Sequence, residues 1–223
     1  MVSIDRCKDE KSERMKKVLI GTTNPSKVKR FEDLLSGYEV EFYTLSDLGI
    51  AGEPEETGRT PEENAVIKAA YYGQYFDGVI CNDSGLYFDG LPLEDPRQPG
   101  LNVRAPQGRR LDDEEMISHY ADLVRSLGGR VSAYYLDGVA VFHAGRISSF
   151  MEEDTARKSA FVMVDTPSAE RHPGWPLDSL SKNRDGAYFT EGKKLTPGTT
   201  EENVLLGEYR KRLTAFLAQA LGL

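Results

Sequence analysis

A short polar loop near the start of the chain carries groups that commonly hold a phosphate. Its hydroxyl, amide and lysine side chains come from Thr22, Thr23, Asn24, Ser26 and Lys27. The loop joins a buried strand expected at residues 17–21 to a helix expected at residues 27–36, and free backbone N–H groups at a helix N-terminus attract anions. The glycine pattern of a Walker A loop is absent. We interpret the loop as a candidate phosphate site; the alternative is a capped helix with a surface lysine.

Three carboxylates offer the hard oxygen ligands that Mg²⁺ prefers. Glu55 and Glu56 are adjacent in a polar loop at residues 51–60, and Asp83 follows a short apolar strand expected at residues 79–82. Ligand crevices in open α/β sheets lie at the carboxyl ends of strands. This placement favours Asp83 as a functional group. The alternatives are solvated acids in the polar loop and an aspartate-initiated turn after the strand.

A helix start follows the two adjacent acids. Thr60 has the properties of an N-cap, a proline comes next, and Glu63 completes a capping box. The expected helix, residues 61–76, carries Asn64 and Lys68 four residues apart, and therefore on one face. Both side chains become candidates for substrate contact, with a solvent-facing lysine as the alternative.

Other catalytic chemistries have little support in the sequence. The three histidines, His119, His143 and His172, are scattered and lack metal-ligand spacing. No Gly-x-Ser-x-Gly motif surrounds Ser84, which argues against a serine hydrolase. A disulfide framework is excluded because the chain has only two distant cysteines, and neither has the partner that a nucleophile needs.

The elements that must position these residues alternate between strand and helix in the first half of the chain. The second half is richer in strands. Beyond the segments already described, the patterns predict a strand at 39–45, a helix at 112–127, several strands over 130–164 with a turn at 144–145, and a final helix from Thr199 to about Leu221 with Glu202 at its start. This order indicates an α/β fold with a mixed sheet.

Length and composition bound the function. The chain has 223 residues and a net charge of -8, which disfavours nucleic acid as a partner. It contains no apolar run long enough to cross a membrane. Residues 1–16 are polar and read as a flexible extension, with Met15 as an alternative start. Residues 17–223 suit one large domain or two tightly joined lobes. The two cysteines, Cys7 and Cys81, are typical of a reducing, cytoplasmic location.

Several motifs together resemble the inosine triphosphate pyrophosphatase family. The phosphate loop, Gly21 to Lys27, is similar to that family's opening motif, and the stretch from Glu55 to Ala69 is similar to its central motif almost letter for letter. The segment Asn82-Asp83-Ser84-Gly85-Leu86 resembles its Asp-Asp-Ser-Gly-Leu motif. The order and the spacing also agree over residues 17–105, where Pro99-Gly100 and Arg104 echo the family's next segment.

The resemblance implies a fold and a reaction. The fold is a long curved mixed sheet with flanking helices and two lobes around a central cleft, usually in a homodimer. The reaction is Mg²⁺-dependent hydrolysis of a nucleoside triphosphate to the monophosphate and pyrophosphate. Its usual role is the removal of deaminated purine nucleotides such as ITP, XTP and dITP.

The resemblance also assigns roles to residues. Thr22, Thr23, Asn24, Ser26 and Lys27 would hold phosphates, while Asn64, Lys68 and Ser84 would contact the substrate. Glu55 or Glu56 would bind Mg²⁺ together with Asp83, which would also act as general base. Lys27 and Lys68 would stabilise the negative charge that builds up in the transition state.

The chain departs from the family pattern at three places. Asn82 replaces the first aspartate of the strand motif, and Gly174-Trp175-Pro176-Leu177-Asp178 replaces Gly-Phe-Gly-Tyr-Asp. The family's Ser-His-Arg base-reading motif is absent; Gly207-Glu208-Tyr209 stands where the final helix should carry it. Trp175 and Asp178 are expected to contact the substrate, and His172 could replace one hydrogen bond to the base, although a surface histidine is the simpler interpretation. Two alternatives stay open: a nucleotide-binding sensor that has lost turnover, and a pyrophosphohydrolase with another nucleotide substrate.

Overall fold

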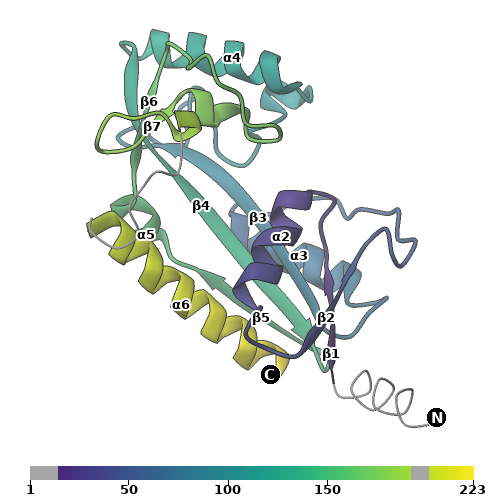
Figure 1. The fold of residues 1–223 in the computed structure, drawn as a ribbon. Coiled ribbons are helices and arrows are strands. Elements are labelled where there is room, and N and C mark those ends of the chain that lie inside the picture. Colours follow the sequence, from purple (N-terminus) through teal and green to yellow (C-terminus); the bar gives the residue numbers. More distant parts are fainter. Residues whose placement is uncertain (1–14, 192–200) are drawn as a thin grey trace, which may run out of the picture. The chain divides into compact units, whose positions relative to one another are not determined.

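The computed structural model describes residues 15–191 and 201–223. The chain divides into two compact units, and neither is continuous in sequence. The first unit comprises Met1–Asp83, Gly138–Met151 and Arg210–Leu223, and the second comprises Ser84–Asp137 and Glu152–Tyr209. Figure 1 shows the strands and helices of both units.

The described strands form one seven-stranded mixed sheet with the order β2-β1-β3-β4-β6-β7, and β5 pairs with β4. The strands are β1 (Lys16–Ile20), β2 (Val40–Thr44), β3 (Val79–Phe88), β4 (Arg130–His143), β5 (Arg146–Met151), β6 (Phe161–Val164) and β7 (Ser181–Lys182). The pairs β1–β2 and β1–β3 are parallel. The pairs β4–β5, β4–β6 and β6–β7 are antiparallel. The predicted α/β class, with a mixed sheet that becomes antiparallel in its second half, is confirmed.

The first unit holds α2 (Pro25–Leu34), α3 (Pro61–Tyr72) and the second half of α6 (Glu201–Leu221). One of its apolar clusters lies between α3 and the sheet, because Ala65 and Ala69 of the helix pack with Leu19 and Val79 of the strands. The small alanine side chains bring α3 close to these strands. This close packing fixes the helix that carries Asn64 and Lys68.

The second unit holds α4 (Asp113–Ser126) and α5 (Glu153–Lys158), with three short 3₁₀ helices. These are η1 (Pro106–Gly108), η2 (Pro176–Ser179) and η3 (Phe189–Glu191). Figure 1 shows α4 alongside the β6–β7 region, and the helix packs against β6 and η2. The core of this unit joins Tyr120 and Val124 of α4 to Phe88, Met163 and Leu180.

Several predicted helix boundaries were wrong. Helix α2 begins at Pro25, two residues before the expected start, because Asn24 caps it and the proline occupies the first turn. Helix α3 ends at Tyr72 rather than residue 76. A Cβ at Gly73 would lie only 2.5 Å from the Phe142 ring, so the glycine permits a close approach of β4 where the helix ends. Helix α4 begins at Asp113, after its Asp112 N-cap, one residue later than the predicted start at residue 112.

The strand expected at residues 79–82 is much longer in the structure. Strand β3 continues to Phe88, so the segment Asn82–Gly85 lies inside a strand rather than in a turn. Strand β1 pairs with β3 only at Val79 and Ile80. Asp83 therefore lies beyond the carboxyl end of β1, the neighbouring parallel strand. Its own strand, β3, continues past it to Phe88.

Other expectations meet the structure in part. The predicted turn at Ala144-Gly145 is confirmed, with both residues at positive φ between β4 and β5. Helix α5 was not predicted within the strand-rich region. Lys16, assigned to the extension, is the first residue of β1. Residues 1–14, including Cys7, and the predicted cap at Thr199 lie outside the described residues. Among the helices that the structure describes, none is long and apolar enough to span a membrane.

Candidate active site

The phosphate loop begins where β1 leaves the sheet. The Gly21 N–H donates to the Ile80 carbonyl at 2.8 Å. A Cβ at Gly21 would lie 2.5 Å from the Cys81 sulfur and 2.8 Å from the Tyr72 ring. Only glycine fits this close approach without a shift. The loop therefore starts directly beside β3, two residues before Asp83.

The loop is organised around Asn24. Its side-chain oxygen accepts the Ser26 N–H at 2.9 Å, and its backbone N–H donates to the Thr22 hydroxyl at 3.2 Å. The Lys27 N–H donates to the Asn24 carbonyl at 3.1 Å. The expectation of free N–H groups at this turn is thus wrong for Ser26 and Lys27. What the loop offers an anion is the side chains of its hydroxyl residues and of Lys27, beside the positive end of α2.

The polar side chains of the loop are all at least partly accessible, so they can contact a ligand. Thr23 is exposed, whereas Thr22, Asn24, Ser26 and Lys27 are half-buried. Lys27 was predicted as the first residue of the helix and is the third residue of α2, in its first turn. All of these residues belong to the first unit, as does Asp83.

Asp83 is the centre of a buried polar cluster. Its Oδ2 accepts a hydrogen bond from the Asn64 side chain at 2.9 Å, and its Oδ1 lies 3.5 Å from the Lys68 ammonium. The Lys68 ammonium also lies 2.6 Å from Glu56 Oε1. The side-chain oxygen of Asn64, Oδ1, accepts the Gly58 N–H at 2.8 Å, which fixes the orientation of the side-chain amide. The predicted Asn64–Lys68 face of α3 does point at Asp83, and the solvent-facing alternative for Lys68 is wrong.

The electrostatics of the cluster favour a charged lysine. Burial alone lowers the pKa of Lys68, but the charge of Asp83 and the hydrogen bond to Glu56 outweigh it and raise the pKa overall. The Lys68 ammonium is therefore a fixed positive charge between two carboxylates. Burial raises the pKa of the neighbouring Cys81 thiol to about 12. This thiol is an inert part of the core rather than a nucleophile.

The two adjacent acids differ in their surroundings. Both are exposed, but Glu56 forms an ion pair with Lys68, whereas Glu55 forms none with Lys68 among the described residues. The described residues contain no group of three or more His, Cys, Asp and Glu side chains arranged for a metal. Of the three carboxylates predicted to bind a metal, Glu56 and Asp83 therefore converge, on Lys68.

Ser84 has a partner that the sequence did not indicate. Its hydroxyl donates to Asp137 Oδ1 at 2.5 Å. Successive residues of a strand point to opposite faces, so Ser84 and Asp83 leave β3 in opposite directions. Asp137 lies 53 residues away on β4. Its sequence signal is that it is the one acidic residue within β4.

Trp175 and Asp178 lie together on one turn of the second unit. Trp175 precedes η2 and is 47% exposed. The Trp175 N–H donates to the His172 carbonyl at 2.9 Å, and the Asp178 N–H donates to the Trp175 carbonyl at 3.1 Å. His172 Nδ1 lies 2.9 Å from Asp178 Oδ2. The simpler interpretation, that His172 is a surface histidine, agrees with its 37% exposed side chain, although the ring also contacts the Asp178 carboxylate.

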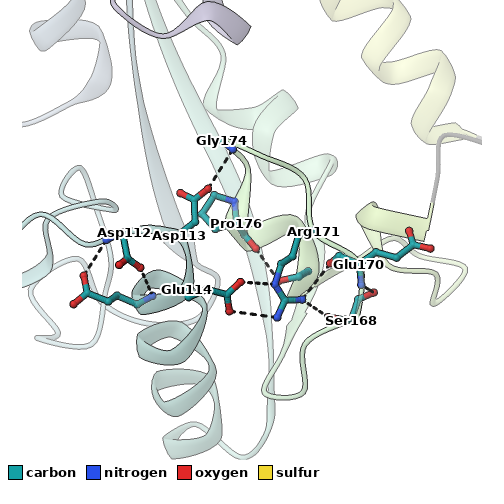
Figure 2. A network of polar contacts seen from close by, with 10 residues as sticks. Asp112, Asp113, Glu114, Ser168, Glu170, Arg171, Gly174 and Pro176 are labelled. Carbon is teal, nitrogen blue, oxygen red and sulfur yellow. Dashed lines mark hydrogen bonds and ion pairs between the residues drawn. The ribbon is translucent and has the colours of Figure 1, made fainter.

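The same turn is connected to the start of α4. Figure 2 shows the Arg171 guanidinium against the Glu114 carboxylate and the Gly174 N–H directed at Asp113. Neither connection was predicted, because each joins residues more than 50 positions apart.

Comparison with known proteins identifies the family. A model of the Ham1 family matches residues 18–157. Among curated relatives, a "dITP/XTP pyrophosphatase" of Thermoanaerobacter pseudethanolicus is 46% identical over 86 residues, covering 38% of this chain and 41% of the relative. The protein of the same name from Oceanobacillus iheyensis is 32% identical over 139 residues, covering 61% of this chain and 68% of the relative. The chain thus spans about two fifths of the length of the first relatives it matches.

Solved structures agree on the fold. A Ham1 protein from Coxiella burnetii superposes with a TM-score of 0.68 at 21% identity, covering 92% of this chain and 100% of the other. The Ham1 protein of Staphylococcus aureus gives a TM-score of 0.64 at 21% identity, covering 90% and 99%. The resemblance to the inosine triphosphate pyrophosphatase family that we inferred from the motifs is confirmed. The chain belongs to the Ham1 family.

Proposed function

We propose that the chain hydrolyses nucleoside triphosphates between the α and β phosphates. Water attacks, the anhydride bond breaks, and the products are a nucleoside monophosphate, pyrophosphate and a proton. The observation that carries the proposal is the geometry of Asp83, a buried carboxylate that Asn64 holds by one oxygen and Lys68 faces at the other. The "dITP/XTP pyrophosphatase" relatives support the same reaction class.

Asp83 is suited to act as general base. The Asn64 amide occupies Oδ2, so Oδ1 is the oxygen left to accept a proton from water. The Lys68 ammonium lies 3.5 Å from this same oxygen. Proton transfer to a positioned side chain typically contributes about 10²–10⁴-fold to a rate.

The lysines are suited to stabilise negative charge. Lys68 is held in place by Glu56 and Asp83, and its pKa is raised, so it keeps its charge at neutral pH. Lys27 lies in the first turn of α2 beside the hydroxyl groups of the phosphate loop. Charges that are already in position when the reaction begins cost no reorganisation during it.

Glu56 and Asp83 also fit a divalent metal ion. Their carboxylates converge on one cationic group, Lys68 Nζ, which shows that both can face a single positive charge. Mg²⁺ commonly binds through one or two carboxylates together with substrate phosphates. We propose that this pair, with Glu55 nearby in the same loop, holds Mg²⁺. When bound, the metal supplies positive charge to the phosphate oxygens.

We place the biological role in the removal of deaminated purine nucleotides such as ITP, XTP and dITP. The net charge of -8 favours a free nucleotide over nucleic acid as the partner. A homodimer in the cytoplasm, without a membrane or nucleic-acid partner, completes the proposal.

One rival function has an observation in its favour. Asn82, buried at 2% exposure, stands where the resembled family has an aspartate, so the chain has one carboxylate fewer on β3. A nucleotide-binding sensor would tolerate this loss. A sensor would not require Asp83, Asn64 and Lys68 to remain assembled, which is why we favour hydrolysis.

The test is a panel of nucleoside triphosphates incubated with Mg²⁺ at slightly alkaline pH. Pyrophosphate and orthophosphate are measured separately, with the Asp83→Asn variant as the blank. We expect pyrophosphate without stoichiometric orthophosphate. Tight nucleotide binding without release of either product would favour the sensor, and release of orthophosphate alone would place the cleavage at the outer bond.

A further inference from the structure

The segment that carries Trp175 is tied to the first turn of α4 at two points. Arg171 Nε donates to Glu114 Oε1 at 2.8 Å, and Arg171 Nη2 lies 3.4 Å from Oε2 (Figure 2). The Gly174 N–H donates to Asp113 Oδ2 at 3.3 Å. Arg104 donates to the other oxygen of Asp113 at 2.8 Å. We call these contacts the α4 clamp.

The α4 clamp holds the chain immediately before the indole. Arg171, four residues before Trp175, and Gly174, the residue directly before it, both contact α4. Gly174 has a φ of +80°, which few other residue types adopt. After the indole, Leu177 is 3% exposed and anchors η2 in the core. The backbone of Trp175 is therefore fixed on both sides, while 47% of its surface remains exposed.

The charges of the clamp are mutually stabilised. The hydrogen bond to Glu114 raises the pKa of Arg171, and the hydrogen bond from Arg104 lowers the pKa of Asp113. The four side chains are nevertheless 33–70% exposed. Ion pairs with this exposure contribute little to global stability. What these contacts hold is the chain segment that leads into the exposed Trp175.

We propose that Asp113 and Glu114 are positioning residues that hold the Trp175 indole ready to stack on the nucleotide base. This inference rests on the proposed function, because it requires that the chain binds a nucleotide. A fixed aromatic ring loses less conformational freedom on binding than a mobile one. The clamp therefore affects the affinity for the base and not the chemistry at Asp83.

Trp175 is the only tryptophan in the chain, so its fluorescence reports on this residue alone. The test variant is Asp113→Ala/Glu114→Ala, which removes both acids and leaves the Asp112 cap intact. The matched control is Asp122→Ala, which breaks the Arg125–Asp122 pair on the same helix. Thermal melting of each variant establishes that the fold is retained.

We expect lower fluorescence anisotropy and stronger acrylamide quenching in the double variant than in the wild type and the control. KM should rise roughly 5-fold for every base, with kcat changed less than about 2-fold, because the lost interaction acts in binding. In a Trp175→Ala background, the same double substitution should leave KM unchanged, because residues that act through one group are not additive.

Unchanged anisotropy and quenching would overturn the proposal, even if KM rises. A rise in KM that persists in the Trp175→Ala background would also overturn it, because the clamp would then act through another residue. The fluorescence measurements need no substrate. If the chain binds no nucleotide, the proposed function is refuted. The effect of the clamp on the mobility of Trp175 can still be measured in that case, so the two failures are distinguishable.

Discussion

Asn64 donates its side-chain N–H to Asp83 across 2.9 Å, and both residues are buried. The amide cannot rotate without loss of its second hydrogen bond, from the Gly58 N–H. The two oxygens of Asp83 are therefore distinguished: Oδ2 is occupied by the amide, and Oδ1 faces Lys68.

The Asp83→Asn variant tests this arrangement. The new amide must present its carbonyl oxygen to Asn64, which directs its NH₂ group at the Lys68 ammonium. We expect turnover to fall at least about 10²-fold, because the base and one metal-binding charge are both lost. Pyrophosphate release measures the effect. The control Asp33→Asn breaks an exposed pair with Lys29 and should leave turnover intact. Near-normal turnover in Asp83→Asn would exclude Asp83 as the general base.

Lys27→Ala tests the phosphate loop. Lys27 lies in the first turn of α2, where its ammonium can meet the outer phosphates of a triphosphate. We expect weaker binding of a nucleoside triphosphate, slower turnover, and a much smaller effect on monophosphate binding. Lys29→Ala is the matched control on the same helix, because Lys29 is 68% exposed and pairs with Asp33. Calorimetric titration decides the question: equal losses for both ligands would show that Lys27 does not contact the phosphate chain.

The sequence predicts the part of the site that is built from local motifs. Asn64, Lys68 and Glu56 lie on or beside one capped helix, and i, i+4 spacing places the first two on one face. Asp83 comes from a single strand in the same unit. Short-range patterns together with the family resemblance therefore select four residues that the structure brings together.

The sequence does not predict contacts between segments that lie far apart in the chain. The Ser84–Asp137 bond and the Arg171–Glu114 pair join residues 53 and 57 positions apart. The length of β3 was also missed, because Asn82–Gly85 has the composition of a turn. Pairing with neighbouring strands overrides that local preference, as is common for β structure.

Gly138→Ala tests the packing that holds α3. A Cβ at Gly138 would lie 2.2 Å from the Glu62 nitrogen and 2.3 Å from the Pro61 carbonyl carbon, both of them backbone atoms. The start of α3 must shift, so we expect a loss of about 1–3 kcal/mol in the free energy of unfolding. Gly37→Ala is the control, because nothing lies within 4 Å of its new Cβ. Urea denaturation measures both, and equal stabilities would contradict the close approach of β4 to α3.

Tyr120→Phe tests a buried phenol in the core of the second unit. Burial raises the pKa of Tyr120, and its hydroxyl donates to the Val103 carbonyl at 3.0 Å. At neutral pH we expect the variant to lose about 1 kcal/mol of stability, the usual effect of one hydrogen bond. Above pH of about 10, an unfolded tyrosine ionises while the folded one stays neutral, so the wild type loses stability as the pH rises.

The Tyr120→Phe variant lacks this ionisation, so its stability should fall less steeply at alkaline pH and its deficit should shrink. Chemical denaturation at pH 7 and pH 11 gives the two differences. The exposed Tyr38, replaced by Phe, serves as the control. A deficit that is the same at both pH values would show that Tyr120 titrates normally.

The last prediction concerns the choice of base. Discrimination of roughly 10⁴–10⁵ requires buried polar groups that a wrong partner leaves unpaired. The family's Ser-His-Arg motif would supply them, but α6 carries Gly207-Glu208-Tyr209 in its place, and the Ham1 family match ends at residue 157. What the chain offers instead is Trp175, whose stacking is worth roughly 1–3 kcal/mol and accepts any base, with His172 directed at Asp178.

We therefore expect the preference for ITP over GTP in kcat/KM to stay below about 10², and Trp175→Ala to raise KM for all bases together. Steady-state kinetics with ITP, XTP, GTP and ATP measure both. An ITP preference in the thousands would mean that other residues of the chain have rebuilt a purine-specific pocket.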